Sequence, residues 1–342
     1  MEFLSSTFAP LLNLPHDPVF KYIFIAINVI SIICWVLSLI TQNFSQIDKI
    51  WSIEPALFAW VFLFTSIYFN GASTSNNPII KSNESSQLRL IIMWLFVTLW
   101  GSRLTYNFWR KGGYEWKNED YRWHYVRKMF DYPNKTFLFH IFNIVFISFF
   151  QNYLLLGLVM PMWFIQTNAT NKLLKHQEPF NILDIVVTVV LFSLFSIEII
   201  ADQQQWKFQA NKYKWIELSK QDKKTNFTQE EIESFKRGFL INGLFKYSRH
   251  PNFFAEISMW WAFYAFTISS QYSTIVNNFS YSILLNYSVW ATLSLTLLFQ
   301  GSTVLTESIS SSKYPEYAKY KARVSRLIPF FTTYQPKEHK KN

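Results

Sequence analysis

The segment 247–256 gathers an unusual number of ionisable and polar side chains. It reads Tyr-Ser-Arg-His-Pro-Asn-Phe-Phe-Ala-Glu. Pro251 disfavours helix at the residue before it and fits the first turn of a helix that begins there. The free N–H groups of that turn, with Arg249 beside them, suit an anionic group such as a nucleotide phosphate. An ion pair between Arg249 and Glu256 at the membrane edge is the structural alternative.

Charged residues also occur within or beside long apolar runs. A charge at the centre of a membrane helix costs about 2.5–3.5 kcal/mol on insertion scales. Glu256 is therefore a candidate catalytic group, and Arg103 is a candidate phosphate ligand or partner of an acid such as Asp48 or Asp202. Snorkelling to the membrane surface would also explain Arg103.

Two further patterns could carry chemistry. Glu198 and Asp202 are four residues apart, so on a helix they share one face, where carboxylates can act as acids or bind a ribose. A solvated helix end explains them equally well. Tyr314, Tyr317 and Tyr320 follow one helical side that continues to Arg323. Such a side could hold an adenine and a pyrophosphate, or lie as an amphipathic helix at the membrane surface.

The elements that must position these residues are long apolar runs. Of the 342 residues, 50% are apolar and 16% charged, against about 25% charged in an average soluble protein. Seven runs approach or exceed the roughly 20 residues that cross a bilayer. They are Phe20–Thr41, Pro55–Gly71, Leu88–Phe108, Phe137–Pro161, Ile182–Ala201, Phe253–Ser269 and Ser282–Leu305. The sequence therefore predicts an all-α integral membrane protein, a polytopic bundle of about seven transmembrane helices.

The basic residues predict the orientation of these helices. Segments 109–136, 202–252 and 306–342 carry seven, ten and eight Lys or Arg, whereas 72–87, 162–181 and 270–281 carry one, two and none. By the positive-inside rule the N-terminus is luminal and the C-terminus cytosolic. The net charge of +10 reflects this bias and suits anionic lipid, with no nucleic-acid partner expected.

Glycosylation sequons offer a check of this topology. Three fall in the segments assigned to the lumen: Asn83, Asn168 and Asn278. Three fall on the cytosolic side, where the topology forbids glycans: Asn43, Asn134 and Asn226.

Several kinds of site are not expected. The single cysteine, Cys34, excludes an intramolecular disulfide and a multi-Cys zinc site. The six histidines lack the spacing of a metal site, so no metal is expected. There is no G-x-G-x-x-G and no Walker A motif, so a nucleotide would not be held by a Rossmann domain.

The run 247–256 resembles the Y-S-R-H-P-N-Y-x-G-E signature of the steroid 5-alpha-reductase-like membrane proteins. The chain most resembles a branch of this superfamily whose C-terminal region has no assigned function. Supporting matches are Ile47–Pro55, Trp100–Asn107, Glu119–Trp123, Ala201–Gln204, Thr306-Glu307, Tyr314–Tyr317 and Ile328-Pro329. Together they cover about residues 45–330, a predicted catalytic domain after an N-terminal segment (1–44) and before a basic tail (331–342).

The resemblance implies a membrane-embedded reductase, expected in the endoplasmic reticulum, with NADPH in a cytosol-facing cavity. It would reduce a carbon–carbon double bond of a lipid, steroid or related isoprenoid or enoyl substrate, and an acid would polarise or protonate the other end of that bond. The implied catalytic residues are Glu54, Tyr106 and Glu256. The implied cofactor residues are Arg103, Asp120, Tyr121, Arg122, Asp202, Arg249, His250, Asn252, Glu307, Tyr314, Tyr317 and Arg323.

Two other functions stay open. Isoprenylcysteine methyltransferases share the Arg-His-Pro segment, so the chain could use S-adenosylmethionine to methylate a lipid or prenylated substrate. It could also be a non-enzymatic lipid or sterol binder that retains the fold. The many arginines of the predicted cytosolic face favour the phosphate-bearing NADPH.

Overall fold

The computed structural model describes residues 17–71, 79–170, 178–224, 226–277, 279 and 281–330. These residues form helices and connecting turns without a strand, which confirms the all-α prediction. The chain falls into two compact units. Unit 1 comprises residues 1–189 and 260–295, and unit 2 comprises residues 190–259 and 296–342.

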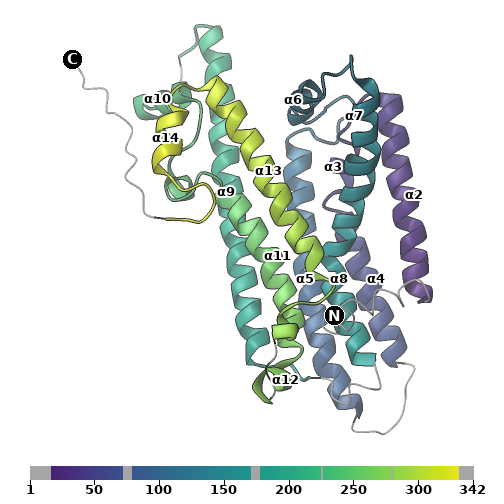
Figure 1. Ribbon diagram of the computed structural model, residues 1–342. Helices are drawn as coiled ribbons and strands as arrows, with labels where there is room; N and C mark the ends of the chain where they lie inside the picture. Colours follow the sequence, from purple (N-terminus) through teal and green to yellow (C-terminus); the bar gives the residue numbers. More distant parts are fainter. Residues whose placement is uncertain are drawn as a thin grey trace. The chain divides into compact units, whose positions relative to one another are not determined.

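Unit 1 is a bundle of long helices together with several short elements (Figure 1). Its helices are α2 (Pro18–Thr41), α3 (Gln46–Ile50), α4 (Glu54–Gly71), α5 (Ile79–Arg110), α6 (Arg122–Met129), α7 (Thr136–Phe142), the π-helical segment η2 (Asn143–Phe150), α8 (Gln151–Thr170), α12 (Tyr272–Asn277) and the 3-10 turn η4 (Tyr281–Leu284). It also includes the beginnings of α9 (Ile182–Lys220) and α13 (Val289–Lys313) and the end of α11 (Pro251–Ser269).

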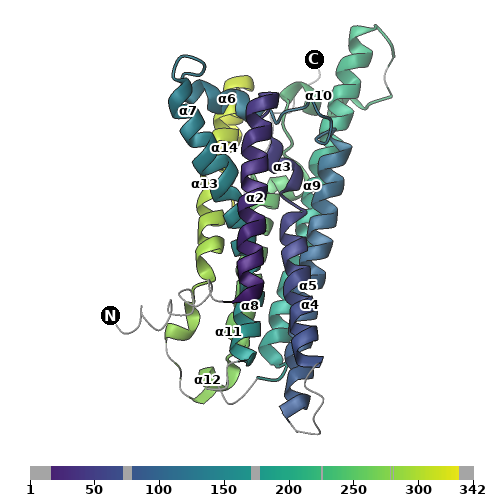
Figure 2. The same cartoon turned by 90° about the vertical axis from the view of Figure 1, so that its right-hand side faces the viewer.

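The centre of unit 1 lies where α4 packs on α5 and α8, and α2 packs on η2 (Figure 2). Phe62, Phe96 and Trp100 are fully buried there. Trp100 meets Trp260 edge to face, with ring centroids 5.1 Å apart. Close aromatic packing of this kind, rather than a hydrophobic effect, holds helices together in lipid.

A buried ion pair fastens the beginning of α9 to α5 in unit 1. Arg89 donates from Nε and Nη2 to the two carboxylate oxygens of Asp184, at 2.7 and 2.6 Å. Asp184 also accepts hydrogen bonds from the Asn181 backbone and the Ser269 hydroxyl. Bidentate geometry and these extra donors offset the cost of burying both charges.

Unit 2 consists of the rest of α9, α11 and α13 together with short elements. These are α10 (Gln229–Arg237), the 3-10 turn η3 (Gly243–Lys246) and α14 (Tyr317–Arg323). Helix α10 begins with a capping box, in which Thr228 and Glu231 are reciprocal partners. Gly238 ends α10 in the left-handed region, at φ 92°, which glycine adopts without strain.

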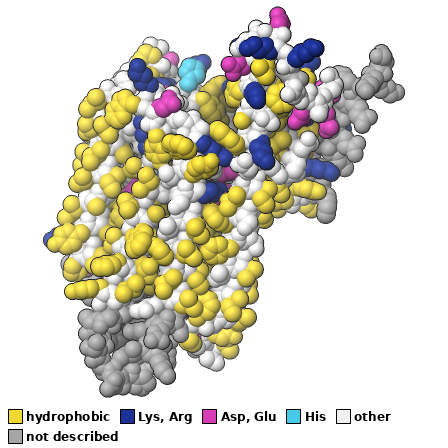
Figure 3. All heavy atoms as spheres, turned by 180° about the vertical axis from the view of Figure 1, so that it is seen from behind, with side chains coloured by type: hydrophobic (Ala, Val, Ile, Leu, Met, Phe, Trp, Pro, Cys, Tyr) yellow, Lys and Arg dark blue, Asp and Glu magenta, His cyan; other side chains and the backbone are white. Residues whose placement is uncertain are grey.

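Among the residues that the structure describes, five helices are long and apolar enough to cross a membrane: Pro18–Thr41, Gln87–Arg110, Thr136–Thr167, Ile182–Lys220 and Val289–Lys313. Residues 54–68 of α4 form a shorter apolar helix, and α11 has 19 residues. All seven predicted runs therefore lie wholly or mostly on helices, but seven crossings remain a prediction. Hydrophobic side chains cover long faces of the helices, as a lipid environment requires (Figure 3).

The predicted boundaries are wrong at the last run. We expected a helix from residue 282, whereas α13 begins at Val289. The Asn286 side chain accepts hydrogen bonds from the backbone and hydroxyl of Ser288, and donates to Tyr264 and Thr267. These hydrogen bonds hold residues 286–288 in a turn, so helix α13 begins only after Ser288.

Candidate active site

Arg249 is the centre of a buried polar cluster in unit 2. Its Nε donates to Glu307 Oε1 at 2.6 Å, and Nη1 donates to the backbone carbonyls of Lys321, at 2.7 Å, and Val324. Its side chain is 7% exposed and that of Glu307 is 3% exposed. The alternative of an Arg249–Glu256 ion pair is therefore wrong: the arginine joins the beginning of α11 to α13 and α14.

Two more side chains approach the same carboxylate, those of His250 and Lys321. His250 Nε2 lies 3.2 Å from Glu307 Oε1, and Lys321 Nζ lies 3.3 Å from Oε2. The His250 ring stacks on Phe253. Since Arg249 and Lys321 carry two positive charges against one on Glu307, the cluster keeps a positive surplus. Lys321 is 48% exposed, so its ammonium is open to an anionic ligand.

The chain before α11 is fastened to the chain after α14. Arg249 donates its backbone N–H to Ser325 O at 2.8 Å, and the Ser248 hydroxyl donates to Leu327 O at 2.7 Å. Phe330 donates its N–H to Tyr247 O at 2.9 Å. These bonds hold the predicted Arg-His-Pro segment in a fixed conformation next to the charge cluster.

A second polar contact in unit 2 joins α9 to α11, and two buried carboxylates lie on the same two helices. Asn252 Nδ2 donates to Asp202 Oδ1 at 3.3 Å, which brings together two predicted cofactor residues. Glu256 and Glu198 are buried, at 6% and 5% exposure. A buried carboxylate on a membrane helix stays a functional candidate.

The tyrosines of the C-terminal segment point into unit 2 instead of into lipid. Tyr317 and Tyr320 pack against Phe239, and all three are buried. The Tyr320 hydroxyl donates to Phe245 O at 2.5 Å. An interfacial helix is therefore the wrong explanation for this spacing, because core packing accounts for it.

Two further observations concern Tyr317 and the neighbouring Lys212. Burial, and then the negative charge of Glu307, raises the pKa of Tyr317 well above its usual range. Lys212, which sequence patterns did not single out, is 5% exposed and donates to Gly238 O at 3.0 Å and to the Tyr314 hydroxyl at 3.4 Å. Its partners are 26 and 102 residues away, so no local pattern could have found it.

In unit 1, the predicted acid Glu54 is 3% exposed at the beginning of α4. Neither of its carboxylate oxygens has a hydrogen-bond partner within the described part of the chain. The predicted tyrosine partner, Tyr106, is 56% exposed and packs on Trp109 and Arg110. The structure thus buries Glu54 and leaves Tyr106 on the surface, so it does not bring this pair together.

The loop residues of unit 1 form a network around Asp120 and Arg122. Arg122 donates from Nε and Nη2 to the Asp120 carboxylate, at 2.8 and 3.1 Å. Burial would raise the pKa of Asp120, but the charge and hydrogen bonds of Arg122 outweigh it and lower that pKa. Asp48 accepts from Trp123 Nε1, and its pKa is raised by burial against the pull of Arg122.

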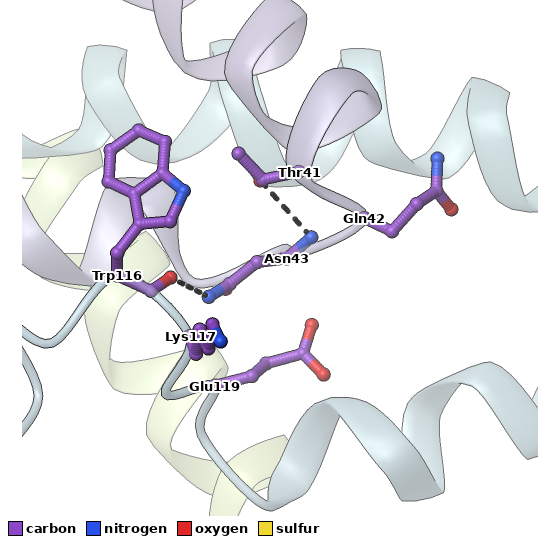
Figure 4. Close-up of a pocket in the computed structure, with 6 residues that line it drawn as sticks. All are labelled: Thr41, Gln42, Asn43, Trp116, Lys117 and Glu119. Atoms are coloured by element: carbon purple, nitrogen blue, oxygen red, sulfur yellow. Dashed lines mark hydrogen bonds between the residues drawn. The ribbon is translucent and has the colours of Figure 1, made fainter.

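A small pocket opens beside this network, at the end of α2 (Figure 4). Its lining residues are Thr41, Gln42, Asn43, Trp116, Lys117 and Glu119. Asn43 spans it by donating to the carbonyls of Trp116 and Asn118, at 3.4 and 2.9 Å. Glu119 binds the Phe44 N–H and Arg127, yet burial raises its pKa.

The predicted residues therefore separate into three groups. Within unit 2 the structure brings together Arg249, His250 and Glu307, joins Asp202 to Asn252, and places Tyr314 and Tyr317 around Phe239. Within unit 1 it joins Asp120 to Arg122 and places Arg103 on α5, half-buried. Tyr121 and Arg323 are exposed. Lys321 is the cluster member that sequence reasoning missed, although it lies two residues before Arg323.

Comparisons with known proteins give the chain a family but no activity. Residues 34–324 match a family described as a protein of unknown function, DUF1295. The chain is also 35% identical over 298 residues to an uncharacterized protein of Schizosaccharomyces pombe, covering 87% of this chain and 76% of that protein. No solved structure matches the chain. The family match and the fission-yeast relative establish that this chain belongs to the DUF1295 family.

Proposed function

We propose that the protein is a membrane-embedded reductase that uses NADPH to reduce a carbon–carbon double bond of a lipid, steroid or related substrate. The observation that carries this proposal is the cluster of Arg249, His250 and Lys321 around Glu307. It is a positively charged site next to the Arg-His-Pro segment, whose resemblance to the steroid 5-alpha-reductase-like proteins suggested NADPH.

The donor set of the cluster fits a phosphate-bearing cofactor. Arg249 binds protein groups, so it supports the site, while Lys321 and His250 would meet the phosphates. The Asp202–Asn252 pair would bind a ribose hydroxyl. NADPH, when bound, supplies a hydride.

The resemblance names Glu54, a buried carboxyl of unit 1, as an acid that would polarise or protonate the double bond. A protonated carboxyl can donate a hydrogen bond or a proton. The apolar surface of the helices suits a substrate that arrives from the bilayer, with the endoplasmic reticulum as the proposed location.

Cofactor affinity of lysine variants tests the proposal. Lys321→Ala should weaken NADPH binding about tenfold, or about 1.4 kcal/mol, as expected for one lost phosphate contact. The matched control is Lys319→Ala, which removes an exposed lysine of the same helix and should bind NADPH normally. Energy transfer from tryptophan to the bound nicotinamide measures both.

The outcomes separate the candidate functions. Equal NADPH affinity in the two variants would show that the cluster is not part of the cofactor site. Binding of S-adenosylmethionine without NADPH would favour a methyltransferase. A folded protein that binds neither would favour a lipid or sterol binder.

A further inference from the structure

A row of polar side chains runs through the apolar interior of unit 1. Ser31, Cys34 and Ser38 follow one face of α2 at i, i+3 and i+7, and are 0%, 6% and 1% exposed. From the helix that packs on α2 come Asn143, Ser148 and Asn152, all at most 1% exposed. An apolar bundle gains nothing in stability from such residues unless they have partners.

Contacts order these side chains into a line that ends at Glu54. Asn143 Nδ2 donates to Ser38 Oγ at 2.8 Å. Cys34 lies one turn further into α2, between the Asn143–Ser38 and Asn28–Tyr153 hydrogen bonds that fix the register of the two helices. Helix α4 runs parallel to α8, with Phe62 against Trp163 and Gln166 bonded to Thr65, so Glu54 is level with the first turn of α8, where Asn152 lies. The line therefore passes from the Ser38–Asn143 pair, past Cys34, to Asn152 and the buried carboxyl.

Along this line, five buried atoms have no hydrogen-bond partner among the residues that the structure describes. They are Glu54 Oε1 and Oε2, Asn143 Oδ1, Ser148 Oγ and Asn152 Oδ1. With Glu54 ionised, four of the five atoms are hydrogen-bond acceptors only, so they require a donor. Water can be that donor, and a buried water typically satisfies about three polar groups of this kind.

The line has an outer end at the pocket of Figure 4. Ser38 lies one turn before Thr41, and Thr41 lines the pocket together with Asn43 and Glu119. Gln46 donates to Thr41 Oγ1 at 3.0 Å, which extends the polar contacts from the helix end to the pocket. The partner helix is π-helical over Asn143–Phe150, and the wider turn of such a segment is common at functional sites.

We propose that this line is a hydrated proton path from the pocket at the end of α2 to the carboxyl of Glu54. The pocket would admit water, and waters bound to Asn143, Ser148 and Asn152 would connect it to Glu54. Each donor on the path passes one proton inward and receives one from the side of the pocket. The net step is that water in the pocket loses one proton and Glu54 gains it.

Ionisable groups also occur on the packed elements. Cys34 lies on the line itself, and Lys117 and Glu119 line the pocket. Among the side chains that the structure describes, the others on these helices are Lys21 and Tyr22 on α2, Asp48 and Lys49 on α3, Tyr68 on α4, Arg89, Arg103, Tyr106 and Arg110 on α5, His140 on α7 and Tyr153 on α8. This inference extends the proposed function by supplying the proton that a reduction consumes, but it concerns proton exchange at Glu54 and does not depend on a cofactor.

Infrared spectroscopy of the purified full chain tests the path. The C=O band that disappears in Glu54→Gln reports the protonated carboxyl, and its shift in D₂O gives the rate of proton exchange. Asn143→Leu should slow this exchange at least about tenfold, because it interrupts the line. The matched control is Asn28→Leu, which removes an asparagine of α2 that binds Tyr153 outside the line. Equal exchange rates in wild type and in Asn143→Leu would overturn the proposal.

A second measurement needs no substitution in the line. Cys34 is the single cysteine, so a small charged thiol reagent such as 2-aminoethyl methanethiosulfonate reports water access to it in the native protein. The path predicts labelling of Cys34. Labelling by an apolar maleimide only would show a dry interior and contradict the path. NADPH binding is measured on the same samples, so failure of the path and failure of the reductase proposal are distinguishable.

Discussion

Arg249 links a sequence signature to the architecture of unit 2. It binds Glu307 on α13 and two backbone carbonyls at α14, so one side chain joins three segments that are distant in the sequence. The partner carboxylate lies 58 residues away. Arg249 thus stabilises the cluster through its contacts with the protein, while the proposed function assigns the ligand contacts to His250 and Lys321.

Removing Arg249 should therefore destabilise the fold and not only weaken binding. Arg249→Met leaves Glu307 buried with fewer donors, and breaking a buried pair on one side costs about 3–5 kcal/mol. The exposed Arg323→Met variant should change stability by less than about 0.5 kcal/mol. Denaturant unfolding in detergent measures both, and equal stability of the two variants would exclude a supporting role for Arg249.

Tyr317 predicts how stability depends on alkaline pH. Burial and Glu307 raise its pKa in the folded protein, whereas an unfolded tyrosine ionises near pH 10. The folded state therefore holds a proton that the unfolded state loses, and stability falls as the pH rises above about 10. Tyr317→Phe should make the melting temperature fall less between pH 9 and 11, a range of about two units around that value. Tyr213→Phe, at an exposed position, is the control, and identical slopes in both variants would contradict the burial of the Tyr317 hydroxyl.

At the scale of elements, the turn between α10 and the following segment depends on glycine. Gly238 has φ 92°, and a Cβ there would lie 2.0 Å from the Tyr314 ring. Lys212 holds the same turn through the Gly238 carbonyl. Packing and backbone conformation therefore both exclude a side chain at this position.

Gly238→Ala should destabilise unit 2, because the left-handed conformation and the overpacked ring each cost about 1–3 kcal/mol. Gly301 on α13 is the matched control, since a Cβ there meets nothing within 4 Å. Gly301→Ala should leave stability unchanged or raise it by about 0.5–1 kcal/mol through helix propensity. Thermal unfolding compares the two. A Gly238→Ala protein as stable as the wild type would show that this turn is not built as described.

The sequence predicted the helices better than their ends and contacts. Lipid forces every backbone group to bond within its own segment, so long apolar runs must be helices. The helix ends differ from the predicted ones. The hydrogen bonds of Asn286 make α13 begin at Val289, and α9 continues beyond the apolar run as one helix to Lys220. Contacts such as Arg249–Glu307 could not be predicted, because side chains far apart in sequence meet only through the tertiary fold.

The same limit applies to the candidate site. The charges of the Arg-His-Pro segment were found because a charge next to apolar helix stands out in sequence. The spacing of the α14 tyrosines also fitted an amphipathic helix at the membrane surface, because an inward and a lipid-facing aromatic stripe have the same spacing. Lys212 and the polar line to Glu54 carry no local pattern and depend on packing between helices.

At the scale of the whole molecule, the distribution of basic residues predicts a luminal N-terminus and a cytosolic C-terminus. Residue 278 and the side chains of Asn83 and Asn168 lie outside the described residues. Asn43 cannot test the topology, because it is 5% exposed and bonded to backbone carbonyls. Asn134 and Asn226 are exposed and can.

Expression in cells that glycosylate in the endoplasmic reticulum therefore tests the topology at these two sequons. Both should stay unmodified because the predicted topology places them in the cytosol, and a glycosidase should cause no mobility shift in a variant that lacks Asn83, Asn168 and Asn278. Since Asn134 and Asn226 are accessible, a glycan on either would invert the predicted orientation.

The most direct test of the reductase proposal is the thermal stability of the detergent-purified protein with NADPH, NADH or S-adenosylmethionine. A ligand that binds only the folded state at about 100 times its dissociation constant adds about 2.7 kcal/mol. The proposal predicts a clear rise in melting temperature with NADPH that S-adenosylmethionine does not reproduce. No shift with NADPH in a folded protein, or a shift with S-adenosylmethionine only, would contradict it.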